Sequence, residues 1–510
     1  MPLTFSAVAL RAIRCATTSA VLLCAAVVSA QAQSLRLAWD PPPGDVAVSY
    51  VVERGTSAGT YTITYPVEAG ATSLTLTDLT AGKKYFFIVR TVDAKGVRSA
   101  PSNEISAVVK AADDGSGGGG EDTDSGGDDG TDDSETEPEP PPPPPPLVLT
   151  ISSEAALRKA LASPRSNVVY QLATGTYRLT RPIVLTGGVQ DVTIRSRTGR
   201  AADVTLLGPP ATVADPQPSA VVAREITRLT LAEVTLRTAA GYAVTLGDGV
   251  HQPKLQGVRF IDNGQFVQSL LHKNGRGASG GLIEGCSFDF VGAAVDLPPG
   301  IDIRGGSGWV LRGNRFKDTK PLTRVQFGPA IVAWEGSRGT LVERNVFINS
   351  TREIVLGLGD RSPDQHSRGV VRNNMIVRKA MTGSRGPAIS VLDSPETLVL
   401  HNTMLLAGTS AVAVEYAHPD SQMVVILNNL ADAAISGRDS AGAIINRNIL
   451  NANASMFVAP SRGDLRLRPD FARTVIDTGL FINAIVPTDA EGDLRPQGAA
   501  PDVGADEVVR

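Results

Sequence analysis

The sequence predicts an all-β protein in which a small β-sandwich is followed by a parallel β-helix. Three observations lead to this fold class. A pattern of short apolar segments recurs every 20 to 31 residues through the second half of the chain, residues 33–110 alternate between apolar and polar side chains, and the repeats lack helical periodicity. With 510 residues, the chain is also too long for one ordinary hydrophobic core.

Residues 1–32 are predicted to be a secretory signal peptide. Arg11 and Arg14 precede an apolar stretch that is too short to span a bilayer, and this stretch ends in the small-residue motif Ala30-Gln31-Ala32. Lipid attachment at Cys24 is the alternative, but Leu23 stands where a small residue is expected. We therefore expect cleavage after Ala32 and a secreted protein. No later segment is apolar enough to cross a membrane.

The charge of the chain is concentrated in one segment. The formal net charge is −4, but residues 112–139 carry 12 acidic residues and no basic one. Residues 148–510 hold 38 basic against 33 acidic residues, which is far from the dense basic footprint of a nucleic-acid binder. An anionic or neutral glycan suits this mildly basic body better. Cys286 is the only cysteine beyond the signal peptide, which excludes an internal disulfide.

Residues 33–110 read as the strands of a small sandwich. Leu37-Ala38-Trp39, Tyr50-Val51-Val52 and Tyr85-Phe86-Phe87-Ile88-Val89 are strand-like, and turn residues separate them. The run from Leu79 to Tyr85 is similar to the corner in which a tyrosine hydroxyl ties back to the preceding turn. The segment thus resembles a fibronectin type III domain, a resemblance that implies a spacer or attachment module.

A linker is predicted over residues 111–147. Its first part is composed mainly of glycine, acidic residues, serine and threonine, and cannot bury enough apolar surface to become ordered. Pro140–Pro146 should then form a stiff polyproline spacer. We attribute the acidity to solvation of the linker in preference to calcium binding.

The segment 148–510 carries the repeats. They follow a short helix with Ser152 as its predicted cap, and this helix can plug the open end of a solenoid. Each repeat reads apolar, two residues, a key position, one residue, apolar, as in Leu311-x-x-Asn314-x-Phe316. Asparagine suits the key position because it tolerates a left-handed turn and can hydrogen-bond to its counterpart in the next coil. Cys286 fits as a small buried hydrophobe, in preference to a reactive thiol. The key positions are Val234, Val258, Cys286, Asn314, Asn345, Asn374, Asn402, Asn428 and Asn448.

Two segments and the asparagine column resemble the pectate-lyase-like superfamily. These segments are Ala173-Thr174-Gly175-Thr176-Tyr177 and Val192-Thr193-Ile194-Arg195-Ser196, and the ending from Ile476 to Glu507 is similar to that of many secreted bacterial β-helix proteins. The resemblance implies a right-handed parallel β-helix over residues 148–510. It leaves the reaction open, because the superfamily includes lyases, hydrolases, epimerases and non-catalytic adhesins. The calcium-binding aspartates of pectate lyases and the lysine–arginine motif of the chondroitinase-B and alginate-lyase group are not recognisable.

A second strand of each coil can be aligned in quartets, of which the second and fourth residues should point outward. The quartets are Leu270–Lys273, Ile301–Arg304, Ile331–Trp334, Ile354–Gly357, Ile389–Leu392 and Val412–Glu415. Because coils stack about 4.8 Å apart, this alignment predicts one cluster on the outer face. Its members are Lys273, Asp302, Arg304, Trp334 and Glu335. Outward side chains of this kind are expected to add little to the core.

Lys273, Arg304, Asp302 and Glu335 are the candidate catalytic residues. A lysine and an arginine can neutralise a uronate carboxylate, so that a base removes the C5 proton and the glycosidic bond breaks by β-elimination. Alternatively, the two carboxylates could serve as the acid and base of a hydrolase. The competing explanation is that these charges pair with one another on a solvated face.

The candidate substrate-binding residues lie on or beside the same face. Trp334 could stack on a sugar ring, Arg352 and Glu353 could form a wall of the groove, and Glu415 and Tyr416 lie further along. No metal or cofactor is expected, and His272 is expected to be a satisfied core histidine. The sequence therefore predicts a monomeric secreted β-helix protein that binds a uronate-containing polysaccharide. Whether it also cleaves this glycan is left open, and a lyase is the first hypothesis for its activity. A non-catalytic glycan-binding or adhesion protein and a purely structural spacer are the alternatives.

Overall fold

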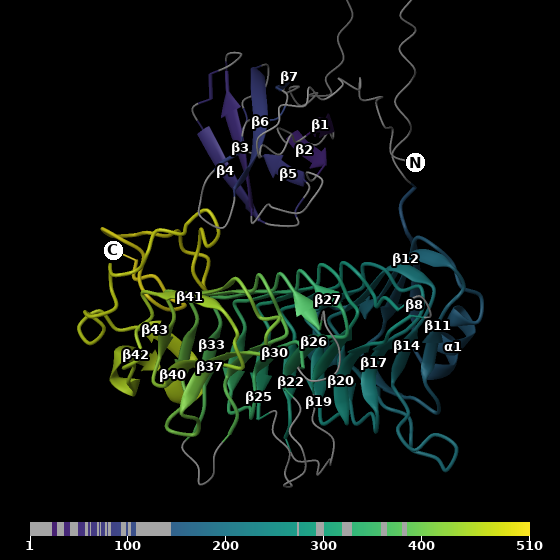
Figure 1. Ribbon diagram of the computed structural model, residues 1–510. Coiled ribbons are helices and arrows are strands. Elements are labelled where there is room, and N and C mark those ends of the chain that lie inside the picture. Colours follow the sequence, from purple (N-terminus) through teal and green to yellow (C-terminus); the bar gives the residue numbers. More distant parts are fainter. Residues whose placement is uncertain are drawn as a thin grey trace, which may run out of the picture. The chain divides into compact units, whose positions relative to one another are not determined.

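The computed structural model contains two compact units, Met1–Pro144 and Pro145–Arg510 (Figure 1). It describes the strands and short adjoining segments between Leu23 and Val108, and then residues 144–272, 275–291, 300–318, 329–358, 365–379 and 385–509. Within these ranges, no helix is long and apolar enough to span a bilayer.

The first unit consists of two antiparallel sheets that share one core. Trp39, Tyr50, Val52, Phe87 and Val89 are among the buried residues that the two sheets bring together. Strand β1 falls within the predicted signal peptide, so cleavage after Ala32 would remove it, and the signal peptide remains a prediction. One sheet has the order β1 (Leu23–Val27), β2 (Leu35–Asp40), β5 (Ser73–Leu76), and the other β4 (Ile63–Glu68), β3 (Ser49–Gly55), β6 (Lys84–Val92), β7 (Ile105–Val108).

The second unit is a right-handed parallel β-helix, as the repeats predict. The chain visits three parallel sheets in a constant order, and each strand pairs with the equivalent strand of the next coil (Figure 1). The twelve-stranded sheet contains β8 (Leu147–Ile151), β9 (Val168–Leu172), β12 (Val189–Ser196), β15 (Ile226–Ala232), β18 (Lys254–Gln256), β21 (Leu282–Glu284), β24 (Val310–Arg312), β28 (Leu341–Glu343), β32 (Val370–Arg372), β35 (Leu398–Leu400), β38 (Val424–Leu427) and β41 (Ala443–Asn446).

The other two sheets have ten strands each. The β10–β39 sheet contains β10 (Gly175–Arg178), β13 (Val204–Leu207), β16 (Thr235–Arg237), β19 (Arg259–Ile261), β22 (Ser287–Asp289), β25 (Arg315–Lys317), β29 (Val346–Ile348), β33 (Met375–Val377), β36 (Thr403–Leu405) and β39 (Leu430–Ala431). The β11–β40 sheet contains β11 (Ile183–Leu185), β14 (Val221–Ala223), β17 (Tyr242–Leu246), β20 (Gln265–Ser269), β23 (Ile301–Arg304), β26 (Ile331–Trp334), β30 (Ile354–Leu356), β34 (Ile389–Leu392), β37 (Val412–Ala417) and β40 (Ala434–Arg438).

Helix α1 (Glu154–Leu161) closes the first end of the solenoid, and its Leu157 is fully buried in the main core. The capping residue is Ser153, whose Oγ accepts a hydrogen bond from the Ala156 amide at 3.1 Å. The predicted cap, Ser152, is therefore wrong by one residue.

Two columns of identical side chains run along the inside of the coils. Phe260, Phe288, Phe316 and Phe347 form a stack with centroids 4.5–4.7 Å apart. The asparagines occupy the corner between the twelve-stranded and β10–β39 sheets, where each side-chain amide donates to the side-chain carbonyl of the next asparagine at 2.9–3.0 Å. Both columns follow the predicted repeat, and they fix the register of successive coils.

The asparagine ladder departs from the prediction at one position. The ladder passes through Asn429, not Asn428, because Ile426 pairs with Val399 one coil below. The apolar run from Val424 to Leu427 allows either frame, and only the pairing resolves it. Asn428 instead adopts a left-handed conformation, with φ of 55°.

Cys286 lies in the same column as a buried residue, which agrees with the prediction that it packs as a hydrophobe. Its amide donates to Asn314 Oδ1 at 2.9 Å. Burial raises the pKa of the Cys286 thiol to about 12, so the thiol stays protonated and unreactive at neutral pH.

Asn374→Leu should lower the free energy of unfolding, at the upper end of about 1–3 kcal/mol. The Asn374 amide donates to Val342 O at 2.8 Å and to Asn402 Oδ1 at 2.9 Å, and its carbonyl accepts from Asn345. The substitution leaves these buried partners unsatisfied. Urea unfolding measures the loss, and Asn446→Leu on the exposed edge strand β41 is the control that should change little. Equal effects of the two substitutions would contradict a stabilising ladder.

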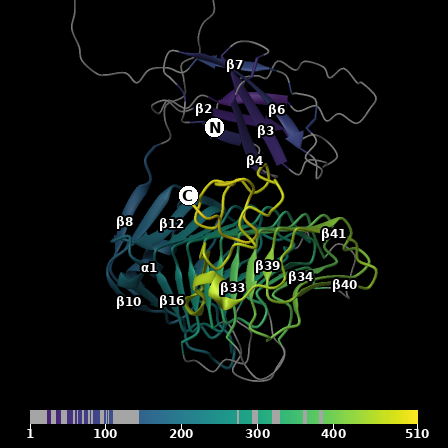
Figure 2. The same cartoon turned by 90° about the vertical axis from the view of Figure 1, so that its left-hand side faces the viewer.

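The C-terminal segment, residues 453–509, packs along the outer face of the β10–β39 sheet. Phe457, Leu465 and Val503 share a separate core with outward side chains of that sheet, among them Met375 and Leu405. Figures 1 and 2 both show this segment, in yellow, beside β33. It contains the short antiparallel pair β42 (Phe457–Ala459) and β43 (Asp464–Leu467).

Candidate functional site

Four of the predicted site residues meet on the outer face of the β11–β40 sheet. Strand β23 pairs with β26 so that Asp302 lies opposite Val332 and Arg304 lies opposite Trp334. Glu335 follows directly at the end of β26. We call Asp302, Arg304, Trp334 and Glu335 the Trp334 cluster.

Asp302 is the centre of this cluster and is 9% exposed. Its Oδ2 accepts hydrogen bonds from Arg304 Nε at 3.0 Å and Nη2 at 2.9 Å, and from the Tyr242 hydroxyl at 3.4 Å. Its Oδ1 accepts from Trp334 Nε1 at 2.8 Å. The Arg304 guanidinium also lies over the indole ring, 4.9 Å from its centroid, and its Nη1 is 3.9 Å from Glu335 Oε1.

These contacts neutralise the central charges against each other. Burial opposes the charged form of Arg304, but the hydrogen bonds and charge of Asp302 outweigh it and raise the pKa of Arg304. Burial, and then the charge of Asp302, raise the pKa of the Tyr242 phenol. The pairing that the sequence left as a competing explanation is thus present between Asp302 and Arg304. Glu335 is held less tightly, by one contact.

The predicted strand around Lys273 is wrong. Strand β20 ends at Ser269, and Val267-Gln268-Ser269 pairs with Ile301-Asp302-Ile303, three residues ahead of the predicted register. A polar inward residue misled the prediction, because Ser269 is buried and its Oγ accepts from the Ala278 amide at 3.3 Å. Lys273 itself lies outside the described residues.

The predicted positions of Glu415 and Tyr416 also shift. Glu415 lies opposite Ser390, two residues from the predicted register, and still points outward. Tyr416 lies opposite the buried Val391 and packs against the main core. A Cβ added at Gly437 would come within 2.2 Å of Tyr416 Cζ, so the ring needs this glycine beside it. The prediction of Tyr416 as a glycan contact is therefore wrong.

Glu353 is not part of a groove wall, and that prediction is also wrong. Its side chain is fully buried and paired with the equally buried Arg378, with Nε–Oε1 and Nη2–Oε2 distances of 3.0 and 2.5 Å. Burial raises the pKa of Glu353, although Arg378 acts in the opposite direction.

Arg352 extends over the outer face of the same sheet. Its Nη2 donates to Ser390 Oγ at 3.2 Å, whereas its buried Nε has no hydrogen-bond partner among the residues described. Burial, the largest influence, lowers the pKa of Arg352, and the charge of Glu415 partly offsets it. Glu415 in turn pairs with Arg438 at 2.8 Å. Arg352 is thus a cation with a spare donor.

An outer apolar cluster, which the sequence analysis missed, joins these polar groups. Val332, Val355, Leu392 and Ala417 point outward yet are at most 8% exposed, and Trp334 and Leu358 pack against them. The sequence does contain a signal for this cluster, because apolar and polar residues fail to alternate in Ile331-Val332-Ala333 and Ile354-Val355-Leu356. The expectation that outward residues add little to the core is therefore wrong for this sheet.

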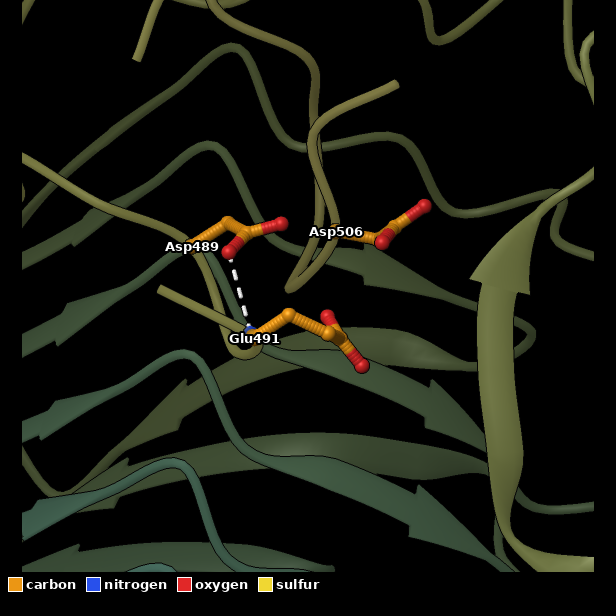
Figure 3. A group of neighbouring side chains, drawn as sticks. All are labelled: Asp489, Glu491 and Asp506. Carbon is orange, nitrogen blue, oxygen red and sulfur yellow. Dashed lines mark hydrogen bonds between the residues drawn. The ribbon is translucent and has the colours of Figure 1, made fainter. Parts of the chain in front are cut away.

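Three carboxylates gather in the C-terminal segment (Figure 3). Ligand atoms of Asp489, Glu491 and Asp506 lie within 4.8 Å of one another. Burial and the neighbouring carboxylates raise the pKa of Glu491 to about 7 and that of Asp506 to about 6. Asp489 Oδ1 accepts three backbone N–H bonds and Asp506 Oδ2 accepts the Leu467 amide, so Asp489 and Asp506 organise turns.

Comparison with known proteins identifies the first unit. Residues 25–108 match the family model described as Fibronectin type III domain. Residues 25–108 are a fibronectin type III domain. The matched range begins inside β1, so it includes part of the predicted signal peptide. A Fn3-like protein from Clostridium thermocellum is 32% identical over 17% of this chain and 90% of its own, with a TM-score of 0.16.

Two solved structures that match beyond the fibronectin type III domain are an enzyme and an adhesin. The Family 28 exopolygalacturonase of Yersinia enterocolitica is 12% identical over 84% of this chain and 98% of its own, with a TM-score of 0.32. PfbA, a surface adhesin of Streptococcus pneumoniae, is 13% identical over 58% of this chain and 85% of its own, with a TM-score of 0.31. No curated protein matches the chain. These low values carry no information about activity.

Proposed function

We propose that this is a secreted protein that binds a uronate-containing polysaccharide along the outer face of the β11–β40 sheet. The observation that carries the proposal is Arg352, a cation on this face with a buried N–H that lacks a partner among the described residues. Leaving such a donor unpaired is unfavourable, and a carboxylate is the group that a guanidinium binds best. A uronate bound on this face would pair with the charge of the Arg352 guanidinium.

The rest of the face suits a sugar polymer. The six strands from β23 to β40 lie side by side, and at about 4.8 Å per strand they span about 24 Å. The half-buried indole of Trp334, which packs against the outer apolar cluster, provides surface for a sugar ring, and Arg304 supplies a second cation. Arg304 ends β23 and Arg352 lies just before β30, two strands further along the same sheet, and two cations spaced along one face suit a repeating anion.

Binding without cleavage is the function that the geometry favours. Asp302 is engaged by three side chains, which leaves it poorly placed to act as a base. Lyase activity is the second candidate, and the loosely held Glu335 favours it. In that case Arg304 would neutralise the uronate carboxylate, Glu335 would remove the C5 proton, and the glycosidic bond would break by β-elimination.

Wild-type protein should bind polygalacturonate more weakly as salt rises from about 50 to 500 mM, because exposed charges are screened over about 10 Å at 0.1 M. Arg352→Ala should lose about tenfold or more in affinity, since hydrogen bonds to charged groups contribute about 1.5–3 kcal/mol. Trp334→Ala should also lose affinity, with an unchanged salt dependence. Calorimetric titration measures all three. Arg228→Ala, which removes an exposed arginine from the twelve-stranded sheet, is the matched control.

Equal binding by every variant at both salt concentrations, or no binding by the wild type, would refute this site. The same mixtures are followed by ultraviolet absorbance, because β-elimination creates an unsaturated uronate. An absorbance rise that is lost in Glu335→Gln would establish the lyase, and a flat trace with intact binding would establish the binding protein. The melting temperature of each variant is recorded, because Trp334 packs against the outer apolar cluster.

A further inference from the structure

We infer that His251 and His272 form a binding site for a first-row transition-metal ion such as Zn²⁺ or Cu²⁺. The two residues occupy equivalent corners of successive coils, where the chain leaves β17 and β20 for the twelve-stranded sheet. Their ring centroids are 6.3 Å apart and their planes are inclined by 77°. Neither residue belongs to the Trp334 cluster.

His272 contributes a buried ring nitrogen. The residue is 9% exposed, and its Nε2 has no hydrogen-bond partner in the described part of the chain. A neutral imidazole that carries its proton on Nδ1 presents a lone pair at Nε2, and this is the form that would bind an ion through that atom.

A metal-binding histidine requires one ring nitrogen that is free of other partners. A ligating imidazole generally donates its other N–H to a carbonyl, carboxylate or water, which fixes the tautomer and the ring orientation. The backbone at His272 is also fixed, because its N–H donates to Arg276 O at 2.6 Å and its carbonyl accepts from Gly275 at 2.9 Å. An unsatisfied buried nitrogen requires an explanation, and a bound ion is one.

His251 supplies the second imidazole and the route of entry. It is exposed, and its Nδ1 lies 3.2 Å from Ser279 Oγ, which leaves Nε2 to face a ligand. Metal–nitrogen bonds of about 2.0–2.1 Å place two ligating rings with centroids about 5–6.5 Å apart, so the observed 6.3 Å requires little movement.

The other three histidines lack this arrangement. Both ring nitrogens of His366 are engaged, by Ser394 and Thr340, and both of His401 are engaged, by Gly504 and Asn428. His418 lies 3.7 Å from the Asp439 carboxylate. Imidazole nitrogen selects Zn²⁺, Cu²⁺ and Ni²⁺ over Ca²⁺ and Mg²⁺, which prefer oxygen. The chemical class of the ion follows from these donors.

Calorimetric titration of the untagged full chain with ZnCl₂ tests the inference. Wild type should bind one Zn²⁺ per chain at this site, and His251→Ala and His272→Phe should each lower the affinity at least tenfold. His418→Ala is the matched control and should bind as the wild type does. Glu491→Gln removes one carboxylate from the group in Figure 3, which an oxygen-preferring ion would choose. This variant should bind zinc as the wild type does, which would exclude that group as the zinc site. A parallel titration with CaCl₂ should be insensitive to both histidine variants.

Absence of zinc binding by the wild type, or full binding by both histidine variants, would overturn the inference. His251 is exposed, so His251→Ala should keep the metal-free melting temperature and remains decisive even if His272→Phe folds poorly. A rise of the wild-type melting temperature on adding zinc, absent in His251→Ala, is the second expected result.

Discussion

Glu353→Ala should destabilise the β-helix by about 3–5 kcal/mol, the largest effect expected of a single substitution here. Glu353 and Arg378 have no exposed side-chain surface, and Arg378 Nη1 is held by Gly386 O at 2.9 Å, so the guanidinium cannot turn to solvent. Removing the carboxylate leaves a buried cation beside Arg352 and Arg385, both of which already feel its charge. Urea unfolding followed by circular dichroism measures the loss.

Two further variants separate the buried charge from other causes. Glu353→Leu combined with Arg378→Met removes both charges, and it should recover most of the stability, because apolar replacements of a buried pair are often neutral. Glu396→Ala breaks a half-exposed pair with Arg368, and it should change stability by less than about 1 kcal/mol. If the double variant were as unstable as Glu353→Ala, lost packing and not an unpaired charge would be the cause.

Acid should weaken the β-helix through His366, by about 3 kcal/mol between pH 6.5 and pH 4. Burial lowers the pKa of His366 to about 3, and its two nitrogens bond Ser394 Oγ at 2.8 Å and Thr340 Oγ1 at 3.1 Å. In the unfolded chain the ring takes up a proton near pH 6.5. Since the folded pKa is lower, the contribution is fully present above pH 6.5 and is lost as the pH falls toward 3.

His366→Asn tests this linkage without relying on absolute stabilities. The stability difference between wild type and the variant should shrink as the pH falls from 7 to 4, because only the wild type must exclude that proton. His401, whose pKa burial also lowers, is present in both proteins and cancels. A constant difference for His366→Asn would contradict a neutral buried ring.

The sequence allowed the fold and most of the repeat to be predicted, because both depend on the spacing of the repeats and on the residue types that recur in them. The phenylalanine stack and the asparagine ladder follow from one recurring pattern, and only the choice between Asn428 and Asn429 went wrong. That choice depends on pairing between coils 27 residues apart, which two consecutive asparagines in an apolar run leave undecided.

The candidate site was harder to predict, because it depends on register to a single residue. Asp302, Arg304 and Trp334 meet as predicted, since their strands keep the same frame. Strand β20 does not keep the predicted frame, because its buried Ser269 is polar and was therefore assigned to the outer face. Tyr416 points inward because Gly437 leaves room for its ring. Glu353 reads as a surface residue until Arg378, 25 residues later, is brought beside it.

The C-terminal segment changes how the solenoid can come apart. Arrays of coils contact only their neighbours and tend to fray from an end, one unit at a time. Here residues 485–505 are bonded to coils at Arg372, Asn373, His401 and Thr403, and apolar contacts reach from Ile348 to Leu430. A segment that runs along the solenoid axis in this way connects several coils to one another, so the last coils cannot unfold one at a time. Under mechanical load or protease attack, this part of the molecule should stay folded as a unit and then unfold in one cooperative step.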